Sequence, residues 1–157
     1  MAVVERLEDV LKKNNIQYKT VAHQEAYTAQ EIAAAIHVPG KELAKVVMVK
    51  AKDRFVMTVM PASWRVDFKK LKEALNEKDL RLATEEEFKA MFPDCEPGAE
   101  PPFGNLYHID TFVDKSLAED EHIFFNAGNH YETVEMLYRD YANIVKPRVA
   151  EFAAHLH

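Results

Sequence analysis

The chain has 157 residues, 48% hydrophobic and 29% charged, which is typical of one globular domain and argues against a disordered segment. Its charged N-terminal region, its single cysteine and the lack of any apolar run near 20 residues exclude a signal peptide, a disulfide framework and a membrane span. We therefore expect a cytoplasmic protein that forms one domain over residues 1–157.

The net charge of −6 is unevenly distributed along the chain. Residues 41–72 contain nine Lys and Arg against three Asp and Glu, a local balance of +6 that leaves −12 for the remainder. Such a basic segment can bind a phosphate backbone while the acidic remainder limits indiscriminate binding. A solvated face of surface lysines fits the same charges, so both interpretations stay open.

The first part of the chain alternates helical and strand patterns. Apolar residues at helical spacing over 3–11 predict an amphipathic helix, and 17–22 alternates as a short strand. The capping box Thr28-Ala-Gln-Glu31 predicts the start of a helix that runs through Ile36. Two β-rich runs, 45–50 and 55–60, predict a hairpin at the centre of a sheet.

The second part mixes further helices and strands without regular βαβ alternation. Asp67 can cap a helix through Leu75, and the capping box Thr84-Glu-Glu-Glu87 predicts a helix ending near Met91. Residues 92–104 contain four of the seven prolines and two of the four glycines, which excludes an interior strand or a helix. Further predicted elements are strands over 106–110, 111–113, 122–125 and 133–137, a turn over 127–130, and a helix from 138 that is interrupted near Pro147 and then resumes. This order predicts an α/β (α+β) fold with a mixed, partly antiparallel sheet.

Familiar catalytic and cofactor motifs are absent from the sequence. There is no phosphate-binding GxxxxGK[ST], no GxGxxG, no GxSxG and no HExxH. The histidines are widely spaced and only one cysteine is present, so we expect no metal and no cofactor. Cys95 lies between Asp94 and Glu96, whose charges should raise the pKa of its thiol and oppose a nucleophilic role.

Lys45 and two glycine-containing segments are the candidate binding features. Lys45 begins an otherwise apolar strand, where a low dielectric strengthens its attraction for phosphate or carbonyl oxygen, although a snorkelling strand-end lysine is the alternative. Gly98-Ala-Glu-Pro-Pro102 can bring a preformed backbone close to a ligand, or can be a rigid connection. Gly128 permits a tight turn that exposes backbone N–H groups and His130, or a plain hairpin turn.

These motifs also occur in a particular order. The series is His23, Thr28-x-x-Glu31, Glu42-Leu-Ala-Lys45, Pro61-Ala-Ser63, Val66-Asp67, Leu82-Ala-Thr-Glu85, Gly98-x-x-x-Pro102-Phe-Gly104, Val113-Asp114 and Phe125-Asn-Ala-Gly128. The ordered set resembles the YbaK/prolyl-tRNA-synthetase-associated editing family over about residues 5–150. The lysine that opens the central strand and the Gly-x-x-x-Pro loop are its most specific elements.

The resemblance implies a mixed, barrel-like sheet of six or seven strands surrounded by helices. It also implies a freestanding aminoacyl-tRNA deacylase, a hydrolase that removes a small mischarged amino acid from the 3′-terminal adenosine without a metal. The partners it implies are the acceptor end of aminoacyl-tRNA and, optionally, an aminoacyl-tRNA synthetase, with no DNA and no membrane. The alternatives are a non-catalytic tRNA- or synthetase-binding module of the same fold and a small-molecule esterase unrelated to tRNA.

The same resemblance assigns roles to residues of this chain. Lys45 is the expected catalytic residue, and Val46 follows it where relatives commonly have a small polar residue, so rate or substrate choice should differ here. The acidic stretch 85–100 would repel tRNA, which favours docking from the side of 41–72. The expected substrate-binding residues are His23, Thr28, Gly98, Ala99, Pro102, Phe103, Gly104, Gly128, Asn129 and His130.

Overall fold

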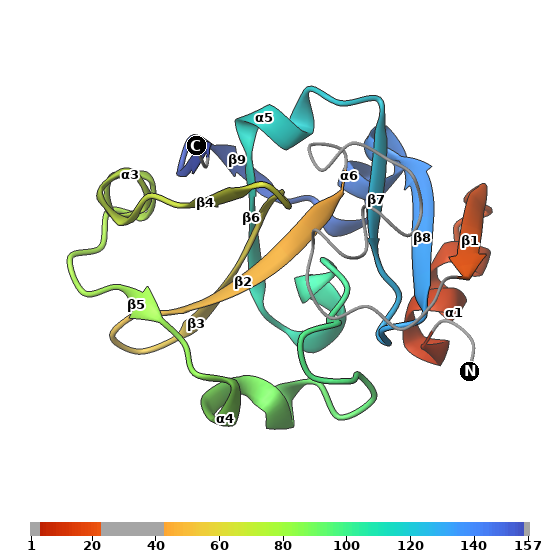
Figure 1. The fold of residues 1–157 in the computed structure, drawn as a ribbon, viewed down its shortest axis with the longest axis horizontal. Helices are drawn as coiled ribbons and strands as arrows, with labels where there is room; N and C mark the ends of the chain where they lie inside the picture. Colours follow the sequence, from red (N-terminus) through yellow and green to blue (C-terminus); the bar gives the residue numbers. More distant parts are fainter. Residues whose placement is uncertain (1–3, 23–42, 156–157) are drawn as a thin grey trace.

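The computed structural model describes residues 4–22 and 43–155, and every structural statement below refers to these ranges (Figure 1). The predicted helix from Thr28 to Ile36, together with His23 and Thr28, lies outside them. The described elements, in chain order, are α1 (Glu5–Lys13), β1 (Tyr18–Ala22), β2 (Ala44–Lys50), β3 (Phe55–Pro61), β4 (Trp64–Val66), α3 (Phe68–Leu75), β5 (Arg81–Leu82), α4 (Glu85–Phe88), η1 (Lys89–Met91), η2 (Gly104–Tyr107), β6 (Asp110–Asp114), α5 (Lys115–Ala118), β7 (His122–Asn126), β8 (Glu132–Leu137), α6 (Tyr138–Val145), β9 (Arg148–Ala150) and β10 (Ala153–His155).

The largest sheet has five strands in the order β5-β2-β3-β6-β9. The predicted hairpin is confirmed: β2 and β3 pair antiparallel from Ala44↔Pro61 to Lys50↔Phe55, and they lie near the middle of the sheet. β6 then pairs parallel with both β3 and β9, so the sheet is mixed. Parallel pairing requires crossover connections, which α3 to η2 and α5 to α6 provide.

A second, antiparallel sheet has the order β1-β8-β7, and β10 pairs with β4 in a third. The two larger sheets meet where the bridge between Leu43 and Phe124 places the beginning of β2 beside β7 (Figure 1). No sheet is closed within the described residues. The mixed α+β class is therefore confirmed, whereas the expected barrel-like sheet of six or seven strands is not.

Apolar side chains fill the space between these sheets and the helices. Leu7 and Leu11 of α1 are fully buried, as the helical periodicity predicts, and Phe103 packs against both Phe125 and Tyr141 with ring centroids 5.4 and 5.3 Å apart. A smaller core lies under α3, around Leu71. None of the described helices is long and apolar enough to cross a membrane.

Both predicted helix starts in the middle of the chain are confirmed. The Asp67 carboxylate accepts hydrogen bonds from the backbone N–H groups of Lys69 and Lys70, at 3.0 and 3.2 Å, and begins α3. At α4, Thr84 and Glu87 form the reciprocal capping box, which fixes where that short helix begins.

Two predicted elements are wrong. Residues 106–110 were expected as strand, but Gly104–Tyr107 is a 3₁₀ helix and the strand begins only at Asp110. The Ile109 N–H bonds to the Gly104 carbonyl at 2.9 Å, which closes a turn there. A Cβ on residue 104 would overlap Thr111 and Ile109, so glycine allows this tight folding back.

The second wrong element is the resumed C-terminal helix, because the chain after Pro147 forms β9 and β10. Asp114 explains the extended conformation of this segment. Its Oδ1 accepts hydrogen bonds from the N–H groups of Phe152 and Ala153, both at 2.9 Å, while Oδ2 caps α5 through Ser116. These bonds use the N–H groups that a helix would need.

Candidate functional site

Lys45 is the second residue of β2, where the antiparallel hairpin opens. The side chain is half-buried, and its ammonium group makes no hydrogen bond or ion pair in the part of the chain that the structure describes. Burial lowers the pKa of Lys45 below its ordinary value, with no nearby carboxylate to raise it. No described residue therefore compensates the charge of this ammonium group.

The beginning of β2 lies beside the middle of β7 (Figure 1). The bridge between Leu43 and Phe124 is parallel, so both chains run the same way from it. The beginning of the strand that carries Lys45 therefore lies beside the strand that precedes the predicted glycine turn.

The loop at Gly98 and the turn at Gly128 are bound to each other by backbone hydrogen bonds. The Gly128 N–H donates to the Ala99 carbonyl at 3.0 Å, and the Glu96 N–H donates to the Gly128 carbonyl at 2.8 Å. His130 adds a third link, since its Nε2 lies 2.8 Å from the Pro97 carbonyl oxygen. Segments about 30 residues apart in the sequence therefore form one rigid unit.

Both glycines in this unit have left-handed backbones that favour glycine. Gly98 has a φ of +84° and Gly128 a φ of +99°. A Cβ at Gly98 would lie 3.6 Å from the His130 Cε1, an ordinary contact, whereas one at Gly128 would overlap the Val4 side chain. Gly98 is exposed and has room beside it, while Gly128 is tightly enclosed.

Side chains of the Gly128 turn stabilise the backbone conformation of that turn. Asn129 Oδ1 accepts hydrogen bonds from the N–H groups of Tyr131 and Glu132 at 2.8 and 2.9 Å. The His130 N–H donates to Glu96 Oε1 at 3.0 Å, and the His130 side chain is only 5% exposed. Substrate contact through Asn129 or His130 stays a prediction, and the described role of both residues is to fix the loop.

Pro102, Phe103 and Gly104 lie deeper than their neighbours. The Pro102 carbonyl accepts a hydrogen bond from the Tyr141 hydroxyl at 2.7 Å, and Phe103 is fully buried among aromatic rings. Ala99 is likewise fully buried. The Gly98–Pro102 loop is thus anchored from below by these residues, and their contact with substrate stays a prediction.

Two residues near this unit were not assigned a role from the sequence. Glu100 is 7% exposed, its Oε2 accepts the Gly98 N–H at 3.1 Å, and burial raises the pKa of its carboxyl while backbone N–H groups act against that rise. Asn126 has a buried Oδ1 that accepts no hydrogen bond, although the residue belongs to the quoted Phe125-Asn-Ala-Gly128 motif. A buried acceptor without a donor was not recognisable from sequence spacing.

The pKa of the Cys95 thiol is raised, as the sequence predicts, but burial contributes more to the rise than the neighbouring charges do. Burial is the main cause that raises the pKa of its thiol to about 12, and the negative charges of Asp94 and Glu100 act in the same direction. The Tyr107 hydroxyl lies 3.2 Å from Sγ and opposes the shift. The thiol therefore stays protonated near neutral pH, which argues against a nucleophile.

The basic segment predicted from the sequence continues away from Lys45 over β4 and α3. The Ala62 N–H bonds to the Leu43 carbonyl at 2.7 Å, which places the start of this segment beside the opening of β2. In the described residues its exposed cations form no ion pairs; they are Arg65, Lys69, Lys70 and Lys72. Among the described residues, no three His, Cys, Asp or Glu side chains are close enough to hold a metal ion.

Comparisons with known sequences single out one family model and one class of enzyme. The model of the aminoacyl-tRNA editing domain matches residues 23–144. The chain is 28% identical to the proline–tRNA ligase of Bacillus subtilis (strain 168) over 112 residues, which are 69% of this chain and 20% of that enzyme. It is 32% identical to the proline–tRNA ligase of Thiobacillus denitrificans over 92 residues, 58% of this chain and 16% of that enzyme. The chain thus spans a fifth or less of either ligase.

Solved structures share the fold. A crystal structure of a candidate trans-editing enzyme for prolyl-tRNA synthetase superposes with a TM-score of 0.85 at 18% identity and covers 98% of both chains. The crystal structure of the hypothetical protein APE2540 superposes with a TM-score of 0.86 at 21% identity and covers 96% of this chain and 100% of that chain. At such identities the likeness extends to the fold alone.

Proposed function

This chain belongs to the aminoacyl-tRNA editing domain family, and from that membership we propose that it is an aminoacyl-tRNA deacylase. The proposed substrate is a small amino acid wrongly esterified to the 3′-terminal adenosine of tRNA. The whole chain is proposed to act as one editing domain, without a metal ion, and with Lys45 as its catalytic residue.

The isolation of Lys45 is the observation that carries this function. Within the described residues its ammonium group is half-buried and has no hydrogen-bond or ion-pair partner. Leaving a buried cation unpaired costs free energy in the unliganded protein, so such a group is suited to an anionic ligand. The terminal phosphate of tRNA and the oxyanion that develops during ester hydrolysis are both ligands of this kind.

The proposed reaction needs little beyond orientation and charge stabilisation. Water attacks the ester carbonyl carbon, negative charge develops on the carbonyl oxygen, and the ribose oxygen leaves with a proton. Lys45 would hold the terminal phosphate or stabilise the oxyanion, while the Gly98–Pro102 loop and the Gly128 turn seat the aminoacyl group. The hydrogen bonds between the two segments lower the cost of ordering that pocket.

The tRNA backbone is proposed to dock on β4 and α3. The four exposed cations of this surface, named above, begin beside the opening of β2 and carry no ion pairs in the described structure. The acidic first turn of α4, Glu85 to Glu87, lies on a different side of the central hairpin (Figure 1). Docking on β4 and α3 avoids that acidic turn and leads the acceptor end towards Lys45.

A non-catalytic module of the same fold is the second candidate. Val46 favours it, because a hydrophobic residue beside Lys45 cannot orient water or an ester through a hydrogen bond. Lys45 would then bind phosphate without bond cleavage, and tRNA binding would persist in the absence of hydrolysis.

The test is hydrolysis of a panel of radiolabelled aminoacyl-tRNAs carrying Ala, Ser, Cys, Thr or Pro, with wild type and Lys45→Ala in parallel. We expect release of one or a few small amino acids by wild type and none by the variant. Filter binding of the same tRNAs at low and high salt runs beside it. Salt-sensitive binding without any hydrolysis would establish the binding module and refute the deacylase.

A further inference from the structure

Arg6, in the first turn of α1, connects two positions that flank the Gly98–Pro102 loop in the sequence. Its Nε lies 3.1 Å from Oδ2 of Asp94, which precedes the loop. Its Nη1 donates a hydrogen bond of 3.1 Å to the carbonyl of Leu106, which follows the loop. One side chain therefore joins both ends of the segment that contains the loop.

A third contact fixes the orientation of the Arg6 guanidinium, which lies over the Tyr107 ring with its Cζ 4.5 Å from the ring centroid. The Tyr107 hydroxyl donates to Asp94 Oδ1 at 3.0 Å, so both oxygens of that carboxylate have partners. Burial raises the pKa of the Tyr107 hydroxyl, which keeps its hydrogen in place for this bond. An isolated exposed ion pair contributes little, but here one planar cation makes three contacts at once, which a lysine would not reproduce.

The position of Arg6 in α1 is a second, independent observation. The first turn of a helix favours negative charge because of the helix dipole, and Glu5 and Glu8 of α1 fit this preference. A cation in the same turn is unfavourable for the helix by itself. The contacts with Asp94 and Leu106, outside the helix, explain why an arginine stands there.

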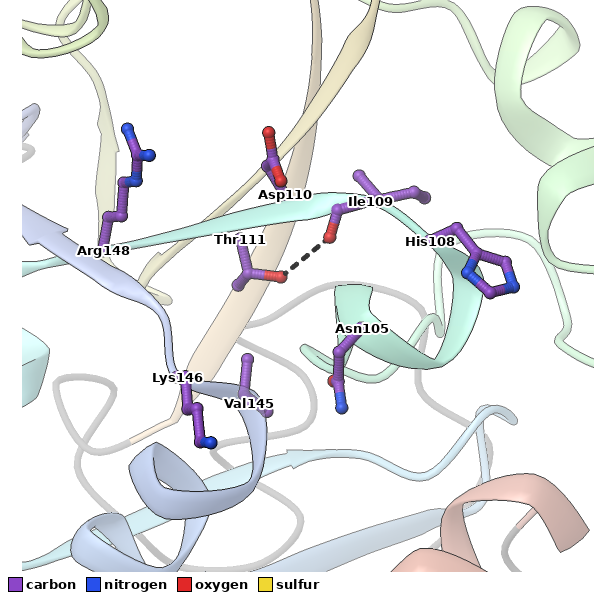
Figure 2. Close-up of a pocket in the computed structure, with 8 residues that line it drawn as sticks. All are labelled: Asn105, His108, Ile109, Asp110, Thr111, Val145, Lys146 and Arg148. Carbon is purple, nitrogen blue, oxygen red and sulfur yellow. Dashed lines mark hydrogen bonds between the residues drawn. The ribbon is translucent and has the colours of Figure 1, made fainter.

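The Leu106 end of this connection is attached to the central sheet. Leu106 belongs to η2, and the Ile109 N–H that follows η2 donates to the Gly104 carbonyl at 2.9 Å. Figure 2 shows the next link, in which the Thr111 hydroxyl of β6 donates to the Ile109 carbonyl at 3.4 Å. Arg6 therefore ties the loop segment to a part of the chain that is fixed at the beginning of β6.

Val4, the N-cap residue of α1, contacts the Gly128 turn in the same way. The Val4 N–H donates to the Ala127 carbonyl at 3.1 Å, and the Val4 side chain occupies the space beside Gly128. The backbone of Gly128 is in turn hydrogen-bonded to Glu96 and Ala99. The beginning of α1 therefore contacts both the turn and the two ends of the loop segment.

We propose that Arg6 is a positioning residue of the deacylase, which holds the Gly98–Pro102 loop, through Asp94 and Leu106, in the conformation that orients the aminoacyl ester. This role rests on the proposed function, since the loop matters to the reaction only if it seats the aminoacyl group. Misplacing a reacting group by about 1 Å can lower a rate about 100-fold, so a looser loop should lower kcat. Arg6 lies outside the proposed docking surface on β4 and α3, so KM for tRNA should change little.

The test compares Arg6→Ala with Lys12→Ala in steady-state deacylation of the aminoacyl-tRNA that wild type hydrolyses best. Lys12 is the matched control, because it is a cation of the same helix whose partner at 2.7 Å, Glu8, also lies in that helix. We expect Arg6→Ala to lower kcat on the order of tenfold with KM within about twofold of wild type, and Lys12→Ala to change neither. Arg6→Ala/Asp94→Ala should lower kcat no further than Arg6→Ala does, because both residues act through one contact.

Amide hydrogen exchange gives a readout that does not depend on activity. The N–H groups of Glu96, Ala99 and Gly128 form the hydrogen bonds within and between the loop and the turn. In Arg6→Ala these amides should exchange on the order of tenfold faster than in wild type, while the amides of the β2–β3 hairpin keep their wild-type rates. Urea unfolding of each variant checks that it is folded under the conditions of both assays.

The possible outcomes separate this role from the proposed function. If wild type hydrolyses a substrate and Arg6→Ala keeps the wild-type kcat, the positioning role is overturned and the deacylase stands. Exchange that accelerates equally in the loop and in the β2–β3 hairpin would also overturn it, because Arg6 would then only stabilise the whole fold. If wild type hydrolyses no substrate, the proposed function fails and the positioning role fails with it.

Discussion

The two ends of the β2–β3 hairpin differ in whether their half-buried cations have partners among the described residues. At the turn, Lys50 lies over the Phe55 ring at 4.8 Å, and Arg54 binds Asp110 at 2.7 Å and approaches Glu77 at 3.9 Å. At the open end, Lys45 is half-buried and has no partner among the described residues. Among the described residues, Lys50 and Arg54 have partners at one end of the hairpin, whereas Lys45 has none at the other. A half-buried cation without a partner in the described part of the chain is suited to a ligand.

The largest expected effect comes from removing that unpaired cation. Lys45→Ala should lower kcat/KM for aminoacyl-tRNA by on the order of 100-fold, because one preorganised charge contact to the reacting group is lost. Lys50→Ala, the matched control at the other end of the same strand, should change kcat/KM by less than about threefold. Equal losses in the two variants would show that general charge, and not the position of Lys45, matters.

The next effect concerns Gly98 and Gly128, in the loop and the turn that are hydrogen-bonded to each other. Gly128→Ala should destabilise the fold by about 3 kcal/mol, since the positive φ and an overlap with Val4 act together. Gly98→Ala, with a similar φ but free space beside it, should cost about 1 kcal/mol. Urea unfolding of both variants measures the difference, and a larger loss for Gly98→Ala would contradict the described packing.

A smaller effect is expected on the surface leading to Lys45. Lys69→Glu/Lys72→Glu on α3 should raise KM for tRNA about tenfold at low salt with kcat nearly unchanged, and the difference should shrink as salt rises. Lys13→Glu/Lys78→Glu changes the net charge by the same amount and should have a weaker effect. Steady-state kinetics at several salt concentrations measures both, and indistinguishable variants would place docking elsewhere.

The buried carboxyl group of Glu100, in the Gly98–Pro102 loop, gives a prediction for how stability depends on pH. Burial raises the pKa of Glu100 in the folded state, so its contribution to stability is present at low pH and is lost as pH rises through that raised pKa. Glu100→Gln keeps an acceptor for the Gly98 N–H and removes the charge, so it should stabilise the fold by about 1 kcal/mol at pH 7. Urea unfolding should show the difference shrinking below pH 4.5. Destabilisation at pH 7 would mean that the ionised carboxylate has a partner of its own.

The smallest effect is expected at Cys95. With a thiol pKa of about 12, nearly all of it is protonated at pH 8, so iodoacetamide should react far more slowly than with a free thiol. Cys95→Ser should leave deacylation within about twofold of wild type. Rapid alkylation with loss of activity would reinstate the cysteine as a candidate nucleophile.

Local signals along the chain predicted much of this fold. The capping residues Asp67 and Thr84 marked the starts of α3 and α4, and the alternating runs around Lys50 marked the central hairpin. The failure at the C-terminal segment arose from contacts between distant residues. β9 and β10 are extended because β6 offers a parallel edge and Asp114 binds the Phe152 N–H, 38 residues away. No short window of sequence contains that information.

The candidate site was likewise predictable from the sequence only in part. Residue type and spacing left the roles of Lys45, the Gly98 loop and the Gly128 turn open, and the resemblance to editing domains assigned them to a site, which stays a prediction. The family match supports the assignment of the chain to editing domains. The sequence could not show that His130 and Asn129 are held by Pro97 and by the turn itself, or that Asn126 has a buried acceptor without a donor. His23 and Thr28 remain predictions.

The attachment of α1 has a consequence for how the chain folds. The Val4 N–H bonds to the Ala127 carbonyl at 3.1 Å, and Leu7 and Leu11 belong to the main hydrophobic core, whose other buried members run from Ala44 to Val145. Docking of α1 is therefore a long-range step of folding that requires the residues around Ala127 to be in place. A chain cut between α1 and Ala127 would lose this attachment even though both pieces keep their local sequence signals.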